Sequence, residues 1–176
     1  YGIIKKDYTL TVIPLFHIGG HMLWTLPHLV VGARVLLERR FDPEVTLRLI
    51  AQEKITNVFL IPAMLKMMLS LPNWKDYDLG SLRYIGAGGE PVPQKIIEDF
   101  AEIGIPILNA NGLTETTDRT MAVRPEYALG KPANCIGKPL TLTDVRVVDQ
   151  EGRDVDPGVE GELLHRGPSV VNSYWD

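Results

Sequence analysis

The chain has 176 residues, of which 45% are hydrophobic, and its formal net charge at pH 7 is −4. This length suits one domain or one and a half, and the apolar fraction argues against disorder. No run of basic residues is longer than a pair such as Arg39 and Arg40, so we expect no nucleic-acid binding through a basic surface. Cys135 is the single cysteine, which favours a reducing compartment and predicts a cytoplasmic protein, with peripheral membrane association left open. Pro27, His28 and Arg34 interrupt the most apolar segment, so no transmembrane segment is expected.

Apolar, β-branched runs recur along the first two thirds of the chain. They cover residues 8–13, 33–37, 57–61, 82–85 and 106–109. The spacing leaves room for a helix between consecutive strands, as parallel crossovers require, and is too long for hairpins. The runs are almost continuously apolar, as in strands that are covered on both faces. We therefore predict an α/β fold with a parallel sheet of about five strands flanked by helices.

The segments between these runs are typical of helices. Asp42 can cap the free amides of a helix that begins at Pro43. Further helices are predicted over residues 63–70 and 94–103, and the methionine-rich side of the former is interpreted as adaptable core. Residues 71–80 are predicted to form a loop.

The pattern changes after residue 117. Residues 119–136 contain prolines, glycines and scattered polar residues and are predicted to be irregular. Residues 144–149 alternate with period two, and turns and a second run at 161–166 follow. We expect a small antiparallel, β-rich, barrel-like segment here. The predicted division is an α/β subdomain over residues 1–135 and the start of a β-barrel-like subdomain over 136–176.

Polar and glycine-rich residues follow three of the predicted strands, at residues 14–20, 86–91 and 109–117. The carboxyl ends of parallel strands share one edge of a sheet, where ligands bind in open α/β folds. The glycine cluster matches neither a dinucleotide fingerprint nor a Walker loop. His17 is either a packed histidine or a pocket-lining one. Glu115 is either a helix-start carboxylate or, with Thr114, a site for a phosphate and its Mg²⁺.

Several short strings occur in a fixed order. They are Pro-Leu-Phe-His at 14–17, Gly-Gly-Glu-Pro at 88–91, Gly-Leu-Thr-Glu-Thr at 112–116, Gly-Lys-Pro at 137–139, and Gly-Glu-Leu at 161–163 followed by Tyr-Trp at 174–175. Together they resemble the adenylate-forming superfamily of acyl-CoA synthetases, aryl-CoA ligases, luciferases and peptide-synthetase adenylation domains. The resemblance covers nearly the whole chain.

The resemblance implies that ATP activates a carboxylic acid as an acyl-adenylate, which a thiol, often coenzyme A, then accepts. Thr114 would contact the α-phosphate, Glu115 would help to hold Mg²⁺, and His17 would lie between the acyl pocket and the nucleotide. Such chemistry depends on alignment and charge stabilisation rather than on a catalytic triad. The implied nucleotide-binding residues are Gly88, Gly89, Glu90, Pro91, Asn109, Ala110, Asn111, Gly112, Leu113 and Thr114, and the implied acyl-pocket residues are His17, Ile18, Gly86, Ala87 and Gly88.

The sequence departs from the family pattern in two places. Asn111 stands where the family usually has a tyrosine that packs against adenine, and Ser173 stands where a glycine is usual. The family's phosphate loop, its ribose-binding aspartate and its C-terminal lysine are not among these 176 residues. We therefore expect a middle segment of a longer ligase, inactive in adenylation by itself.

Three functional hypotheses remain open at this point. The first is a segment of an acyl-CoA synthetase acting on a fatty or other apolar acid, with a peptide-synthetase domain ranked lower because the region from His17 to Trp24 has no aspartate for an amino group. The second is a relative that binds nucleotide or acyl ligand without chemistry, which Asn111 would favour. The third is an unrelated doubly wound domain such as a reductase or transferase. The identity of the acid, the thiol acceptor and the oligomeric state stay open in all three.

Overall fold

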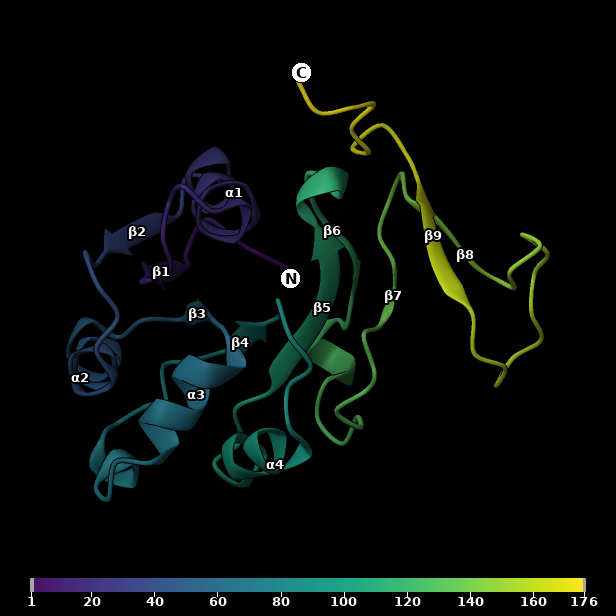
Figure 1. Cartoon of the computed structure of the whole chain (residues 1–176). Coiled ribbons are helices and arrows are strands. Elements are labelled where there is room, and N and C mark those ends of the chain that lie inside the picture. Colours follow the sequence, from purple (N-terminus) through teal and green to yellow (C-terminus); the bar gives the residue numbers. More distant parts are fainter. Residues whose placement is uncertain (1, 176) are drawn as a thin grey trace.

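A seven-stranded mixed sheet forms the centre of the protein, with a separate two-stranded sheet beside it (Figure 1). The structure is a computed structural model and describes residues 2–175, apart from the side chain of Asp118. The strand order of the large sheet is β2-β1-β3-β4-β5-β6-β7. Neighbours among β1 to β5 run parallel, while β6 and β7 are antiparallel additions. The predicted α/β class and the parallel sheet of about five strands are therefore confirmed. The strands are β1 (Tyr8–Thr11), β2 (Arg34–Leu37), β3 (Asn57–Leu60), β4 (Tyr84–Ala87), β5 (Ile107–Leu113), β6 (Asp118–Ala122) and β7 (Lys138–Pro139).

Helical segments connect the parallel strands and cover both faces of the sheet. The π-helical turn η1 (Gly19–Thr25) continues into α1 (Leu26–Val30) on one face, and α2 (Pro43–Glu53), α3 (Pro62–Leu69) and α4 (Gln94–Glu102) lie on the other (Figure 1). The predicted cap of α2 is confirmed, because Asp42 accepts a hydrogen bond of 2.9 Å from the Val45 amide. A short 3-10 turn, η2 (Trp74–Asp76), interrupts the predicted loop. No helix among residues 2–175 combines the length and apolar character needed to cross a membrane.

The alternation of side chains along each strand separates the core into two clusters. Residues such as Leu10, Val58 and Ile85 face α2, α3 and α4 in the larger cluster. The opposite face of the same strands carries Phe59 and several polar or small residues, and η1 with α1 covers it. The polar or small residues are Thr9, Thr11, Asn57, Tyr84 and Gly86.

The prediction that residues 119–136 are irregular is wrong at its start. β6 pairs antiparallel with β5, and a β-bulge lies between Asn111 and Gly112. The remainder of the segment is mostly turns, with the short helix η4 (Pro125–Tyr127). β6 escaped prediction because it begins with Asp118 and Arg119 and has no apolar run.

The predicted antiparallel sheet near the end of the chain is present. β8 (Asp144–Val148) pairs with β9 (Glu162–Arg166) as the separate two-stranded sheet. β7, in contrast, pairs with β6 in the large sheet. The division at residues 135 and 136 stays a prediction.

Asp7 joins three strands at the amino edge of the sheet. Its side chain is 1% exposed and accepts two hydrogen bonds from Arg83 Nη1, at 2.6 and 2.8 Å. Thr56 and the Ile4 amide also donate to it, at 2.9 and 2.8 Å. Burial raises the pKa of Asp7, but the hydrogen bonds from Arg83, Ile4 and Thr56 outweigh burial, so the pKa lies below its ordinary value. The ionised form is therefore the one that stabilises the fold.

We expect Asp7→Asn to lower the free energy of unfolding at pH 7 by about 2–3 kcal/mol, because it leaves a partly exposed Arg83 without its carboxylate. A carboxyl whose pKa is lowered on folding stabilises the protein above its unfolded pKa of about 3.9, and the stabilisation is lost as pH falls. The difference in the free energy of unfolding between wild type and variant should therefore shrink below about pH 4. Urea unfolding followed by circular dichroism measures this free energy at each pH.

A matched control is Asp78→Asn, which removes an ion pair of 2.7 Å with Lys54 in which both side chains are more than half exposed. We expect a much smaller change than in Asp7→Asn, because solvent screens an exposed ion pair. An equal decrease in the free energy of unfolding in the two variants would contradict the role of Asp7 in joining the three strands.

Candidate functional site

A cavity of about 480 Å³ lies at the carboxyl ends of the parallel strands. Its lining comes from the segments that follow β1 and β4, from β3 and the start of α3, and from β5, η3 (Thr114–Thr116) and β6. The strand order reverses between β1 and β3, because the chain moves outward from β1 to β2 and then returns to build β3, β4 and β5. Ligands bind at such a reversal in doubly wound folds. The architecture therefore places the cavity where a ligand site is expected.

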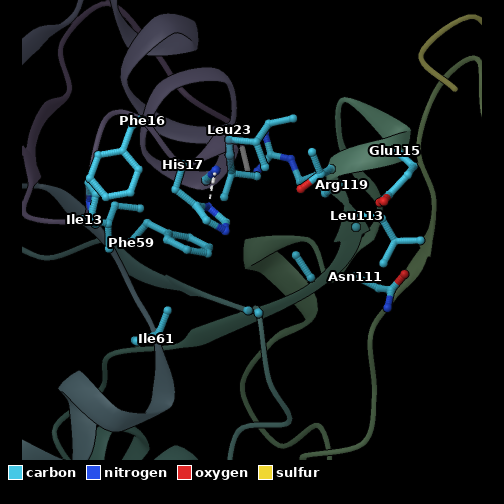
Figure 2. A pocket seen from close by; sticks show the side chains of 18 of the residues that line it. Ile13, Phe16, His17, Leu23, Phe59, Ile61, Asn111, Leu113, Glu115 and Arg119 are labelled. Atoms are coloured by element: carbon cyan, nitrogen blue, oxygen red, sulfur yellow. Dashed lines mark hydrogen bonds between the residues drawn. The ribbon is translucent and has the colours of Figure 1, made fainter. Parts of the chain in front are cut away.

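The two ends of this cavity differ in chemistry (Figure 2). Phe16, His17 and Phe59 lie at one end, and Asn111 and Glu115 lie at the other (Figure 2). Apolar side chains dominate the first end, which we call the apolar end; it comprises Ile13, Phe16, Leu23, Phe59, Ile61 and Met64. Backbone groups, an amide, a hydroxyl and a carboxylate make up the second, which we call the polar end; it comprises Ala110, Asn111, Gly112, Thr114 and Glu115. Gly88 and Gly89 lie between the two ends, beside Phe59 and Ile61.

The helical segment η1 forms one wall of the apolar end and contributes Leu23. The segment begins close to the loop after β1, since a Cβ at Gly20 would lie 2.3 Å from the Pro14 carbonyl oxygen. Only glycine allows this approach. Thr25 reinforces it by donating a 2.7 Å hydrogen bond to the Gly20 carbonyl.

A buried polar network fixes the same segment on the sheet. Trp24 Nε1–H donates to Thr9 Oγ1 at 2.5 Å, and Thr9 donates to the Asn57 carbonyl at 2.9 Å. His28 is fully buried, with Nδ1 2.6 Å from the Trp24 carbonyl and Nε2 2.9 Å from Asn57 Oδ1. The Asn57 amide also reaches the Tyr84 hydroxyl at 3.2 Å. Burial lowers the pKa of His28 against the opposing effect of its hydrogen bonds.

His17 lines the cavity with an exposed side chain. Its Nδ1 accepts a hydrogen bond of 3.0 Å from the Gly19 amide, shown by the dashed line in Figure 2. This bond makes Nδ1 the acceptor and leaves Nε2 to carry the proton of a neutral ring. Of the two interpretations of His17, the pocket-lining one therefore agrees with its position.

The polar end is built by a tight turn after β5. Thr116 Oγ1 accepts from the Leu113 amide at 3.0 Å, and Thr117 ends the turn with a φ of 62°. This turn presents Thr114 and Glu115 as exposed side chains next to each other on η3. A hydroxyl and a carboxylate thus meet the cavity at the end of β5, as the sequence predicts.

Glu115 has a partner from the far end of the chain. Tyr174 donates a hydrogen bond of 2.8 Å to Glu115 Oε1. This bond lowers the pKa of Glu115, together with a smaller contribution from the residue's own backbone N–H, and raises the pKa of Tyr174. Glu115 is therefore ionised at neutral pH.

The residues of the polar end are compatible with Mg²⁺ bound together with a nucleotide. Among the described residues, no group of three His, Cys, Asp or Glu side chains could form a protein-only metal site. Mg²⁺, however, is commonly held by one or two carboxylates plus phosphates and water. The exposed carboxylate of Glu115 fits that arrangement.

The structure brings most of the predicted site residues to one cavity. Those that line it are His17, Ile18, Gly88, Gly89, Ala110, Asn111, Gly112, Leu113, Thr114 and Glu115. Five others do not line it. Gly86 is buried behind Trp24 and Phe59, and Ala87 belongs to the core cluster on the opposite face. Glu90 and Pro91 are exposed in the loop after β4, and Asn109 is buried and donates to the Ala133 carbonyl at 2.8 Å.

Sequence reasoning missed several of the cavity walls. Leu23, Phe59 and Met64 lie within helices and strands and carry no motif, and Arg119 lies on the β6 strand that was not predicted. Phe59 could have been found from the alternation of side chains along β3, because it lies on the same face as Asn57 and near the carboxyl end of the strand. Asn111 Oδ1 is buried and has no hydrogen-bond partner among the described residues, which leaves an acceptor available at the polar end.

Fold and cavity together define a ligand-binding α/β domain with one apolar and one polar end. The family model for AMP-binding enzymes matches residues 2–175. The chain therefore belongs to the AMP-binding enzyme family.

Characterised relatives of the chain are ligases that form coenzyme A thioesters. Indoleacetate–CoA ligase of Aromatoleum aromaticum is 42% identical over 170 residues, which is 97% of this chain and 33% of that protein. Feruloyl-CoA synthase of an Amycolatopsis species is 34% identical over 173 residues, 98% of this chain and 35% of that protein. The chain thus spans about a third of the length of these relatives.

Solved structures share the same fold. O-succinylbenzoate coenzyme A synthetase from Bacillus subtilis, in complex with ATP and a magnesium ion, superposes with a TM-score of 0.84 at 31% identity, over 98% of this chain and 35% of that one. A fatty acyl-CoA synthetase of Mycobacterium tuberculosis gives a TM-score of 0.88 at 26% identity, over 99% of this chain and 34% of that one.

The packing behind the cavity yields a test. A Cβ at Gly86 would lie 2.9 Å from the Trp24 ring and 3.0 Å from the Phe59 ring. We expect Gly86→Ala to lower the free energy of unfolding by about 1–3 kcal/mol, because buried rings must shift. Gly80→Ala is the control, since Gly80 is exposed and its added Cβ would meet the exposed side chain of Asp78. Thermal unfolding that shifts equally in both variants would contradict the tight fit of Trp24.

Proposed function

We propose that the chain is the central part of an AMP-forming acid–thiol ligase, which adenylates a carboxylic acid with ATP and transfers the acyl group to coenzyme A. The observation that carries this proposal is the cavity with an apolar and a polar end at the carboxyl edge of the sheet. An acid with an apolar body would place its carboxylate between the two ends. The nucleotide would meet that carboxylate from the polar side, so that the reacting groups are aligned.

We assign the nucleotide to the polar end on chemical grounds. Backbone amides near Gly88 and Gly89, between the two ends, and the Thr114 hydroxyl offer donors to a phosphate or a base, and Glu115 would hold Mg²⁺ with the phosphates. Glu90, Pro91 and Asn109 would support this site from outside the cavity. His17 lies towards the apolar end (Figure 2), where its Nε2–H could donate to the substrate carboxylate. Gly86 and Ala87 would act on the acyl pocket only through the packing behind it.

The apolar end favours a compact aromatic acid over a long fatty acid. Phe59 and Leu23 line that end, and Trp24 lies behind Phe59 with 5.6 Å between the ring centroids. Aromatic rings prefer such offset or tilted contacts with other rings. The ligases for indoleacetate and ferulate support the same class. A fatty acid is the second substrate class. As for location, the single cysteine, Cys135, is in keeping with a cytoplasmic protein.

Pyrophosphate exchange tests this function. The full-length protein that contains this chain should catalyse ATP–pyrophosphate exchange with arylacetic or cinnamic acids, at a kcat/KM at least about tenfold above that for octanoate or palmitate, the equivalent of ~1.4 kcal/mol of preferential binding in the apolar end. Residues 1–176 alone should show no exchange. Exchange with amino acids only, or by the isolated segment, would overturn the proposal.

A second candidate is a relative that binds nucleotide without catalysis, and Asn111 is the observation that favours it. An amide offers less stacking area to adenine than the tyrosine usual in the family. We expect Asn111→Tyr in the full-length protein to lower the apparent KM for ATP about fivefold, the equivalent of ~1 kcal/mol of stacking.

Asn73→Tyr is the matched control for this substitution, because Asn73 is exposed in the loop after α3 and does not line the cavity. Steady-state kinetics with ATP as the varied substrate gives the comparison. An unchanged KM in Asn111→Tyr would mean that the amide, through its available Oδ1, already binds the base.

A further inference from the structure

The segment that follows β9 returns to the turn carrying Glu115. The Val171 amide donates a hydrogen bond of 2.8 Å to the Glu115 carbonyl, and Thr117 Oγ1–H donates one of 2.6 Å to the Ser169 carbonyl. Tyr174 adds the third link, from its hydroxyl to the Glu115 side chain. These links join residues more than 50 positions apart in the sequence, and all of them converge on η3 and the residue after it.

The third link differs from the other two because it acts on a side chain of the cavity. The Glu115 side chain is exposed and has several rotatable bonds, so without a partner it would sample many rotamers. The Tyr174 hydroxyl binds Oε1 and not Oε2. A ligating carboxylate that is held by a hydrogen bond on its other oxygen is oriented for a metal before the metal arrives.

We propose that Tyr174 is a positioning residue for Glu115 and prepares its carboxylate to bind Mg²⁺ in the presence of a nucleotide. The inference rests on the proposed function of the polar end. Tyr174 does not line the cavity, and it acts on the metal only through Glu115. The segment after β9 therefore contributes to the ligand site as well as to the fold.

The structure separates this role from a purely structural one. The two backbone-directed links of Val171 and Thr117 hold the segment independently of the Tyr174 hydroxyl. The Tyr174 side chain is 65% exposed, so removal of its oxygen buries nothing and leaves no cavity. Tyr174→Phe should thus fold and keep the segment in place.

The test compares Tyr174→Phe with wild type in the full-length protein. Binding of Mn²⁺ together with ATP is measured by electron paramagnetic resonance, and the Mg²⁺ requirement by pyrophosphate exchange. We expect Tyr174→Phe to weaken metal affinity about tenfold, as loss of a partner of a metal ligand commonly does. Binding of ATP without metal and kcat at saturating Mg²⁺ should stay within about twofold of wild type.

Two controls make the outcome decisive. Tyr127→Phe removes the hydroxyl of another exposed tyrosine outside the cavity and should leave metal affinity unchanged. Thr117→Val removes a neighbouring link but keeps the Tyr174 hydroxyl, and it should also bind the metal normally. Unchanged metal affinity in Tyr174→Phe, equal loss in Thr117→Val, or failure of Tyr174→Phe to fold would each overturn the inference. A wild-type protein that binds no nucleotide would instead overturn the proposed function.

Discussion

The arrangement of the whole cavity depends on how the sheet face beneath Trp24 satisfies its polar groups. Thr9 and Asn57 lie on buried parallel strands, and both are fully buried. In proteins, each buried polar group without a hydrogen-bond partner costs on the order of 1–3 kcal/mol of stability. Trp24 and His28 meet this requirement from one helical segment. That segment is therefore fixed in position and rotation by hydrogen bonds as well as by apolar packing.

This constraint determines the shape of the ligand site. Trp24 is held at Thr9, and the preceding Leu23 lines the cavity together with His17 from the loop after β1. Gly86 completes the fit, since any side chain there would displace the Trp24 ring. Packing and hydrogen bonds thus fix the wall of the apolar end that Trp24 supports, whereas Phe16 at the same end is 94% exposed. The polar end consists of backbone and short side chains on a turn, which suits the binding of phosphates by directed hydrogen bonds.

The sequence predicts the fold well where a single physical signal decides it. The apolar runs at constant spacing identify β1 to β5, and Asp42 with Pro43 identifies the start of α2, because each signal is local. β6 was missed because its first residues are charged or polar, and its pairing with β5 and β7 has no local signal in the sequence. The prediction also missed that the two faces of these strands differ in polarity. Thr9 and Asn57 were counted within apolar runs, although they lie on a partly polar face.

The residues of the candidate site were likewise predictable only in part. Residues of the motif strings, such as His17 and Thr114, reach the cavity because their loops follow the carboxyl ends of parallel strands, which share one edge of the sheet. The walls formed by Phe59 and Arg119 depend on strand parity and on the unpredicted β6, which no motif reports. Asn109 shows the converse, since the family resemblance implies that it binds nucleotide, whereas it donates to the Ala133 carbonyl and does not line the cavity. Membership of a motif thus indicates a neighbourhood, and only the backbone geometry decides which atoms meet the ligand.

The two-stranded sheet of β8 and β9 shows why sequence distance hides part of the site. An isolated pair of strands is marginally stable in water, so this sheet depends on its attachment to the rest of the protein. The attachment described above falls on the turn of Glu115 rather than on an inert surface. The contacts that attach the segment after β9 and the hydrogen bond to the Glu115 carboxylate are therefore different contacts on the same turn. A ligand that engages Glu115 would in turn stabilise the attachment, because binding free energy is shared among all groups ordered in the bound state.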